Sequence, residues 1–304
     1  MTLIHGSIVG GLATVPDLES ALADYRDCFG LRVVADAPVG DSLAASWGCH
    51  ANAGSRMVTL QPRSGTHGFL RLVEQPVPKS FRPTTTYGWA AFELTVEDVF
   101  AWPQRLASGG FRVVGEPKEI PGLPYFVAMQ VVGTGGEMLY LNESRSDTPT
   151  SDLPKARSPI DHIFIVILAA RERAESVAWY RDRLGLDESE THVIPYSMIN
   201  KAFGMPLDTL TALTMVQNGR MPIVEIDDYP EAASERPGEP GRLPPGNALV
   251  SLAVESLDDC CCDWIAAPVV QEGPLYAGRR SATTVGAAGE LIELVELAPT
   301  AAAP

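Results

Sequence analysis

The stretch SPIDHIFIVILAARERAESVAWYRDRLGLDE, residues 158–188, opens the second half of this 304-residue chain. A related stretch, GGLATVPDLESALADYRDCFGLRVVADAP, occupies residues 10–38. Both contain Tyr-Arg-Asp, any residue, Phe or Leu, and then Gly-Leu, and the two tyrosines, Tyr25 and Tyr180, are 155 residues apart (180 minus 25). The offset is about half of the chain, which indicates an internal duplication.

Shorter similarities divide each half again. WAAFELTVEDV at 89–99 and NALVSLAVESLDD at 247–259 both begin as apolar strands, and GGEMLYLNES and AGELIELVEL both place an apolar strand after Gly-Glu. Short helical stretches are expected in VFAWPQRLASGGF at 99–111 and DDCCCDWIAAP at 258–268. The chain therefore predicts four modules of strand, helix and further strands, at 1–77, 86–146, 158–230 and 246–298. Connectors rich in Pro, Gly, Ser and Thr separate them.

The helix of module one has clear start, face and stop signals. Asp17 is a predicted N-cap, because its carboxylate can accept from free amides of the first turn. Gly30 is placed as a left-handed helix stop, and Gly185 repeats that role in module three. One apolar face is expected to contain Leu18, Ala21, Leu22 and Tyr25 in module one, and Val177, Tyr180 and Leu184 in module three.

Charge and hydropathy exclude some classes of protein. The net charge of −15 disfavours binding to nucleic acid or to an anionic membrane surface. No apolar run reaches the roughly 18 residues of a membrane span, and no signal peptide is visible. We therefore expect a cytoplasmic protein that acts on a small molecule and has no nucleic-acid or membrane partner. The protein could form a homodimer.

The order of an apolar strand, VPDLESALADYRDCFGL and three strands ending in LRLVEQP resembles the vicinal oxygen chelate superfamily. This superfamily includes glyoxalase I, extradiol dioxygenases, fosfomycin-resistance enzymes and bleomycin-binding proteins. The resemblance implies an α+β fold in which four βαβββ modules pair into two cupped mixed β-sheets with helices outside. It predicts a first domain at 1–146, a linker at 147–158, a second domain at 159–298 and a tail at 299–304.

In this superfamily, metal ligands come from the first and last strands of paired modules. Matching the last strands at Pro76, Pro230 and the two Gly-Glu pairs selects Arg71, Tyr140, Glu225 and Glu293. In the first strands, module one offers Gly10, module two Ala91, and module four Leu249, or Ser251 if the frame slips. Module three offers His162 from IDHIFIV. The count from His162 to Tyr180 is three residues longer than expected, and we assign these three residues to the LAARER turn. If the strand is longer instead, the matching residue is Ile165 and His162 faces away.

The predicted second cup thus holds His162, Glu225 and Glu293, which we expect to bind a divalent metal ion (Zn, Mn, Fe, Ni or Mg). Glu293 could detach as a proton-transfer base, and Glu293→Gln should then remove the ion and turnover with little loss of folding. The alternative to a metal site is structural: Glu225 could be a solvated residue at the end of its strand, and His162 could simply be hydrogen-bonded. A dioxygenase site with two histidines is disfavoured, because no histidine follows His192. We expect His192 itself to stay outside the cup.

Residues 193–206, VIPYSMINKAFGMP, predict a pocket wall in module three. Tyr196 could orient or protonate a substrate oxygen, and Met198 and Phe203 could contact the substrate. Packing within the cup is the alternative for each. In the first cup, Arg71 could bind a carboxylate and Tyr140 could contact the substrate, or Arg71 could instead pair with Glu74 or Glu93.

These features favour a glyoxalase-like lyase, isomerase or epimerase that uses a metal ion on a molecule with adjacent oxygens, without a nucleotide cofactor. A metal-free sequestration protein and a metal-free acid–base enzyme are the alternatives.

Overall fold

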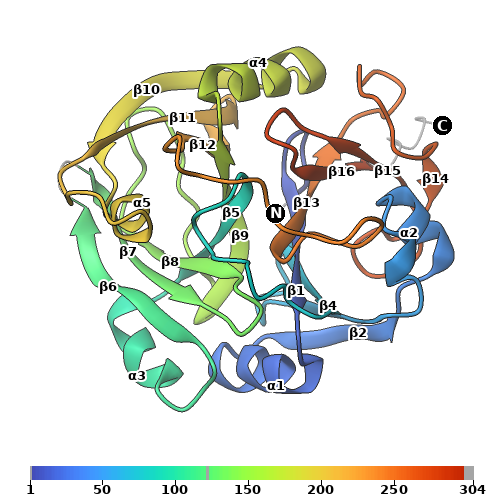
Figure 1. The fold of residues 1–304 in the computed structure, drawn as a ribbon, viewed down its shortest axis with the longest axis horizontal. Helices are drawn as coiled ribbons and strands as arrows, with labels where there is room; N and C mark the ends of the chain where they lie inside the picture. The colour runs from blue at the N-terminus through green and yellow to red at the C-terminus, as the bar shows by residue number, and fades with distance from the viewer. Residues whose placement is uncertain (1, 121–122, 298–304) are drawn as a thin grey trace.

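The computed structural model describes residues 2–120 and 123–297, so the predicted tail at 299–304 lies outside the described residues. It contains two eight-stranded mixed β-sheets, which lie side by side in Figure 1 with their convex faces packed together. Each predicted module forms four strands of one of these sheets. The predicted fold class, with four modules and two cupped sheets, is confirmed.

Modules one and four form one sheet, which we call the outer-module sheet. In spatial order its strands are β14 (Val269–Val270), β15 (Arg280–Val285), β16 (Leu291–Glu296), β13 (Gly246–Val254), β1 (Ile8–Val15), β4 (Phe69–Glu74), β3 (Arg56–Gln61) and β2 (Arg32–Pro38). Strands β1 and β13 pair antiparallel at the centre, and each pairs in parallel with the last strand of its own module.

Modules two and three form the inner-module sheet by the same plan. In spatial order its strands are β10 (Asp187–Pro195), β11 (Leu210–Asn218), β12 (Met221–Asp228), β9 (Ile160–Ala170), β5 (Gly88–Val96), β8 (Met138–Ser144), β7 (Leu123–Val132) and β6 (Arg112–Ile120). Strands β5 and β9 pair antiparallel at its centre.

The pairing of modules corrects the sequence-based domain assignment. We expected module one to share a cup with module two, and module three with module four. Instead, the connectors after modules one and three both cross from one sheet to the other, and they meet at a bridge between Thr86 and Ser234. Glu293 therefore belongs to the same sheet as Arg71, whereas Glu225 belongs to the same sheet as Tyr140.

Five α-helices accompany the sheets in the described ranges: α1 (Leu18–Ala23), α2 (Asp41–Ser46), α3 (Trp102–Leu106), α4 (Arg173–Leu184) and α5 (Ser197–Ala202). A π-helical turn, Asp24–Cys28, extends α1, and single 3-10 turns occur at His50–Asn52 and Val99–Ala101. Helices α2 and α5 occupy equivalent positions, between the second and third strands of modules one and three, and each lies within the curve of its sheet (Figure 1).

The predicted signals for the first helix are confirmed. The Asp17 carboxylate accepts from Ser20 N at 3.0 Å, and the predicted apolar face is buried. Gly30 and Gly185 have φ values of +72° and +64°, the left-handed conformation that a helix stop requires. The helix expected at 258–268 is wrong, because that segment has no regular structure and ends at Pro268.

The duplicated tyrosines hold the two sheets together. Tyr25 Oη donates to Glu137 Oε1 at 3.1 Å, and Tyr180 Oη donates to Glu290 Oε1 at 3.0 Å. Each bond joins a helix of one sheet to the Gly-Glu turn of the other, and both glutamates are buried. Burial raises the pKa of each of these glutamates to about 7. The repeated motif is therefore a docking element between the sheets.

Loss of these hydroxyl groups should weaken the contact between sheets. We expect Tyr25→Phe and Tyr180→Phe each to lower the free energy of unfolding by about 1–2 kcal/mol, because each leaves a buried carboxyl without its phenol partner. The two losses should add, since the bonds lie at separate ends of the seam. Urea denaturation measures both, with Tyr87→Phe as the control because its hydroxyl makes no hydrogen bond to the described part of the chain. A change below 0.3 kcal/mol in both variants would contradict the assignment.

A continuous apolar core fills the space between the convex faces of the sheets. Trp89 of the inner-module sheet donates to the carbonyl of Leu291 in the outer-module sheet at 2.8 Å. Gly11 permits this close approach, since a Cβ at this position would lie 2.7 Å from the Phe92 ring. The four central strands, β1, β5, β9 and β13, are consequently covered on both faces. No helix in the described part of the chain is long and apolar enough to cross a membrane.

Candidate functional site

The outer-module cup is closed by an internal ion pair. Arg71 Nη2 lies 2.9 Å from Glu293 Oε2, and the two side chains are 1% and 0% exposed. Trp47, directly after α2, donates its indole N–H to Glu293 Oε1 at 2.9 Å, and Tyr276 Oη donates to the same oxygen at 2.8 Å. Ser251 Oγ donates to Oε2 at 2.6 Å. The charges of this cup are therefore neutralised within the protein.

Arg71 and Glu293 thus have structural roles. For Arg71, a structural pairing was the alternative to substrate binding, but with other partners. Arg71 pairs with Glu293, and neither Glu74 nor Glu93 is its partner. Its guanidinium also contacts the Tyr276 hydroxyl at 2.6 Å and lies over the Trp47 ring, 5.5 Å from the centroid. The predicted substrate contact at Arg71 is not supported, because aromatic and acidic side chains of the protein occupy its surroundings.

The inner-module cup is open and encloses a cavity of about 430 Å³. Glu93 of β5 and Glu225 of β12 reach it from different modules, and a third glutamate, Glu190 of β10, lies at its exposed rim. Asn142 of β8 donates its amide to Glu93 Oε2, and Tyr196 Oη donates to Glu225 Oε1 at 3.0 Å. The walls are mainly apolar and include Phe126, Phe164, Ile165, Leu213 and Met215.

Burial alters the protonation of Glu93 and Glu225. Desolvation raises the pKa of Glu225 to about 7, although the hydrogen bond from Tyr196 opposes the shift. Desolvation also raises the pKa of Glu93, and the nearby Glu225 charge adds to this effect. Two neighbouring acids in an apolar cavity cannot both ionise easily. The pair therefore retains a proton near neutral pH and can exchange it with a bound molecule.

A buried aspartate lies deeper in the same cup. Asp227 is 1% exposed, and neither of its carboxyl oxygens has a hydrogen-bond partner in the described structure. Desolvation, followed by the charges of Glu225 and Glu93, raises its pKa well above the ordinary value. Tyr140, Tyr196 and Tyr229 surround this group, and burial raises the pKa of each phenol. Asp227 is thus held in its neutral form.

The two cups differ in charge at matching positions. The duplication relates module one to module three and module two to module four, so Arg71 corresponds to Glu225 and Glu293 to Tyr140. An arginine and a glutamate cancel each other in the outer-module cup. In the inner-module cup, Glu93 and Glu225 have no ion-pair partner among the described residues. Uncompensated acids beside an open cavity make the inner-module cup the candidate functional site.

The predicted metal ligands do not meet. Glu293 is bonded within the outer-module cup, Glu225 lies in the inner-module cup, and His162 contacts Asp161 between the sheets. Strand β9 has 11 residues, whereas β1 has 8. The three surplus residues therefore lie in the strand and not in the turn. Ile165 consequently faces the cup, as expected for the longer strand, and the prediction that these three side chains share a site is wrong.

The predicted wall of module three lies in the inner-module cup. Tyr196 donates a hydrogen bond to Glu225. Among the predicted wall residues, Tyr196 is therefore the best placed for acid–base chemistry. Met198, Phe203 and Tyr140 belong to the apolar cluster beneath the carboxyl groups, where Phe203 packs edge-on against Tyr229. For Met198 and Phe203, such packing within the cup was the alternative to substrate contact. His192 of β10 lines the cavity, so the expectation that it stays outside the cup is wrong.

Sequence reasoning missed Glu93 and Asn142. The signal for Glu93 was present, because one acid within the buried strand WAAFELTV is costly without a function or a partner. We counted to Ala91, two positions earlier on the same face of the strand. Asn142 stands two positions after the predicted Tyr140 and faces the same cup. Strand alternation thus identified the correct face, but not the correct residue along it.

Comparisons with known proteins agree with this architecture. Residues 8–136 match the family model of the Glyoxalase/Bleomycin resistance protein/Dioxygenase superfamily. This match covers 129 of the 304 residues, within modules one and two (136 minus 8 plus 1). Glyoxalase I from Zea mays superposes with a TM-score of 0.58 at 17% identity, covering 95% of this chain and 92% of that one. No curated protein matches the sequence significantly.

Two further solved structures are similar to this chain. A putative dioxygenase from Bacillus subtilis subsp. subtilis str. 168 superposes with a TM-score of 0.61 at 11% identity, covering 98% of this chain and 87% of that one. TnmS3, an antibiotic binding protein from Streptomyces sp. CB03234, gives a TM-score of 0.32 at 23% identity, covering 47% of this chain and 98% of that one.

Divalent metal ions are common in the superfamily, so the donors of the inner-module cup were compared with such a site. Across residues 2–120 and 123–297, no three or more His, Cys, Asp or Glu side chains are grouped to hold an ion. The amide nitrogen of Asn142 faces Glu93, and the Tyr196 hydroxyl occupies one oxygen of Glu225. This donor set does not fit the predicted three-ligand ion.

Proposed function

We propose that the protein binds a small, largely apolar carbonyl compound in the inner-module cup and moves a proton on it. Apolar walls suit an alkyl or aromatic substituent. The Glu225–Tyr196 pair then serves as the acid–base group, and the proposal rests mainly on its placement beside Glu93 in an apolar cavity. A pKa of about 7 suits Glu225 to proton transfer at neutral pH.

The proposed step is an isomerisation or epimerisation. Ionised Glu225 removes a proton from the carbon next to a carbonyl group, and the C–H electron pair moves into an enolate. The protonated Glu93 carboxyl or the Tyr196 hydroxyl stabilises the enolate oxygen through a hydrogen bond. Glu225 then returns the proton to the same carbon on either face, or to the neighbouring carbon of a 2-hydroxyketone, in which case the hydroxyl proton passes to the former carbonyl oxygen through Glu93 or Tyr196. No electrons are gained or lost, and no co-reactant is needed.

Deuterium exchange tests this proposal even though the natural substrate is unidentified. A panel of 2-hydroxyketones and 2-oxoaldehydes with alkyl or benzyl substituents is incubated with protein in ²H₂O, and loss of the α-proton signal is followed by ¹H NMR. We expect Glu225→Gln to slow exchange about 10²-fold or more and Tyr196→Phe about 10-fold or more. Glu190→Gln, at the exposed rim of the cavity, is the matched control and should change the rate less than threefold.

Ligand binding separates catalysis from sequestration, the second candidate, which the dominance of apolar walls favours. Affinity in Glu225→Gln should stay within about threefold of the wild type if Glu225 acts mainly on the proton. Saturable binding without exchange on any compound would support a sequestration protein and contradict the proton-transfer role. Equal exchange rates in wild type and Glu225→Gln would contradict the assignment of Glu225.

A further inference from the structure

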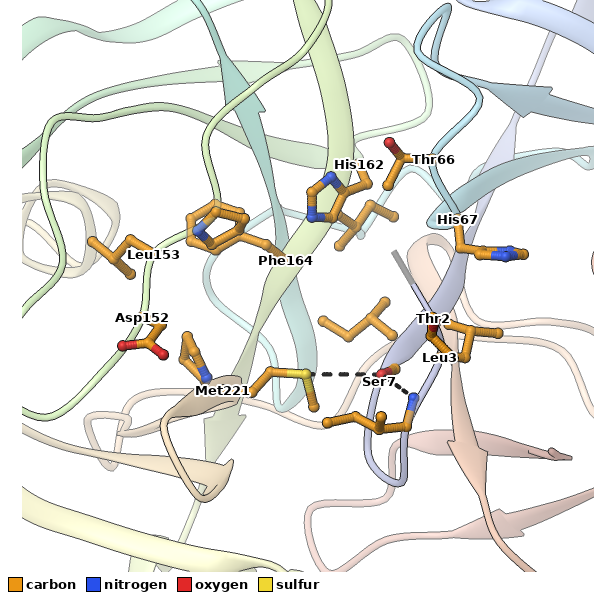
Figure 2. Close-up of a pocket in the computed structure, with 15 residues that line it drawn as sticks. Thr2, Leu3, Ser7, Thr66, His67, Asp152, Leu153, His162, Phe164 and Met221 are labelled. Atoms are coloured by element: carbon orange, nitrogen blue, oxygen red, sulfur yellow. Dashed lines mark hydrogen bonds between the residues drawn. The ribbon is translucent and has the colours of Figure 1, made fainter. Parts of the chain in front are cut away.

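A second cavity, of about 270 Å³, lies at the junction of the two sheets, outside both cups. The N-terminal segment, the β3–β4 loop, the linker before β9 and the ends of β9 and β12 all contribute to it. In Figure 2, His162 and Thr66 lie at its upper edge, Phe164 and Leu153 on one side, and Thr2 and Leu3 on the other. We call this cavity the inter-sheet pocket.

The walls of the inter-sheet pocket are predominantly apolar. Leu3 and Ile8 come from the outer-module side, and Leu153, Phe164 and Met221 from the inner-module side. Ser7 is occupied within the protein, because its hydroxyl faces Met221 Sδ at 3.8 Å and accepts from Ile4 N at 3.0 Å. The cavity therefore suits a compact apolar group, with few polar atoms free to contact it.

Imidazole nitrogens supply the free polar atoms. His162 Nδ1 lies 3.3 Å from Asp161 Oδ1. That carboxylate also accepts from Ser64 Oγ and Arg157 N, both at 2.8 Å. Burial opposes ionisation of Asp161, but these hydrogen bonds lower its pKa to about 2, so it remains an acceptor. An ionised Asp161 orients the Nδ1–H tautomer of His162 and leaves Nε2 as an acceptor.

A second imidazole, that of His67, lines the pocket on the side of Thr2 and Leu3 (Figure 2). His67 Nδ1 is buried and has no hydrogen-bond partner in the described structure. Desolvation, followed by the charge of Arg279, lowers the pKa of His67, so its ring is neutral. Buried polar atoms in native proteins are normally paired. In Figure 2 the His67 ring extends away from the His162 ring, so a hydroxyl group bound by His162 would not pair with His67 Nδ1.

We propose that the inter-sheet pocket is a second binding site, for a compact aromatic molecule that carries one hydroxyl donor, of the phenol class. The ring packs between Phe164 and Leu3, and the hydroxyl donates to Nε2 of His162. Leu153, Phe164 and Pro222 line both this pocket and the inner-module cup. The two sites are therefore neighbours that share a wall, but the proposal does not depend on the chemistry of the cup.

The test uses methionine methyl groups as separate reporters of the two cavities. Met221 lines the inter-sheet pocket and Met215 lines the inner-module cup. Full-length protein with ¹³C-labelled methionine methyl groups is titrated with 4-methylphenol, and with toluene as the match without a hydroxyl. We expect a saturable shift of the Met221 methyl signal, with tighter binding of 4-methylphenol than of toluene.

Two variants examine the contacts. His162→Phe should weaken 4-methylphenol binding about five- to tenfold, the loss of one hydrogen bond, while toluene binding changes less than twofold. Ile4→Trp, at a position 47% exposed, should fill the pocket and weaken both ligands more than tenfold without unfolding the protein. His192→Phe, in the inner-module cup, is the matched histidine control. A shift of Met215 alone, no saturable shift, or equal effects of His162→Phe on both ligands would overturn the proposal.

Discussion

Breaking the Arg71–Glu293 pair is expected to lower the free energy of unfolding by about 3–5 kcal/mol in Arg71→Met and in Glu293→Gln. Both side chains are almost completely buried, at 1% and 0% exposure. Each single substitution leaves the other charge in the core without compensation. The larger part of the loss is the desolvation of that remaining charge, rather than the strength of the pair itself.

The double variant Arg71→Met/Glu293→Gln distinguishes these contributions. It removes both charges, so its stability should recover by about 2 kcal/mol or more relative to the sum of the two single losses. Arg145→Met removes an arginine from the exposed pair with Glu119, and should cost no more than about 1 kcal/mol. Urea denaturation of the four variants gives the coupling energy. Strictly additive losses in the double variant would show that the two charges do not compensate each other.

This expectation reverses the role that the sequence suggested for Glu293. From sequence alone, Glu293→Gln should affect a metal ion and leave folding almost intact. The strand position was correct, and the side chain does point into a cup. The residues that neutralise it, Arg71 and Trp47, come from module one, more than 200 positions away. Their contact depends on which modules pair, and no local pattern records that choice.

Local signals predicted the elements well because local interactions determine them. Asp17 begins its helix with a side-chain cap, and Gly30 ends it with a positive φ. Neither interaction depends on the rest of the fold. The same applies to the apolar faces that contain Tyr25 and Tyr180. Their partners, Glu137 and Glu290, lie in the Gly-Glu repeats that the sequence also revealed. The sequence repeats thus included both residues of each hydrogen bond. They did not predict that these residues are in contact.

The candidate site was harder to predict, because small offsets along a strand change which residue faces it. Three extra residues in β9 exchange His162 for Ile165 in the cup. A difference of two positions in β5 separates Ala91 from Glu93. Glu225 and Tyr196 were selected correctly as residues of one cup, and the structure joins them by a hydrogen bond. Their partner Glu93 follows from the pairing of modules two and three.

Stability should fall as pH rises from about 5 to about 8, by several kcal/mol. Burial raises the pKa of Glu137 and of Glu290 from 4.5 to about 7, and that of Glu225 likewise. Between these values the folded protein retains protons that the unfolded chain has released. The stabilisation is fully present below pH 4.5, and it is lost as pH rises through 7.

The size of this effect follows from the shifts. A rise from 4.5 to about 7 corresponds to on the order of 3 kcal/mol for each group. The net charge of −15 acts in the same direction, since further ionisation increases self-repulsion. Asp161, whose pKa is lowered to about 2, opposes the trend only in more acidic solution, where its stabilising charge is lost. The maximum of stability is therefore expected near pH 4, between the ordinary pKa values of Glu (4.5) and Asp (3.8).

Urea denaturation at pH 5, 6, 7 and 8 measures the trend, and Glu137→Gln/Glu290→Gln identifies its source. Glutamine reproduces the shape of the protonated acid: its oxygen can accept from Gly135 N or Ala288 N, and its amide can donate to Tyr25 or Tyr180. We expect the double variant to reduce the slope between pH 5 and 7 by about 1–3 kcal/mol per pH unit. Glu143→Gln, a partly exposed glutamate of β8, should leave the slope nearly unchanged. A wild-type stability that rises from pH 5 to 8 would show that these carboxyl groups are ionised in the folded protein, because the Tyr and backbone donors then outweigh burial.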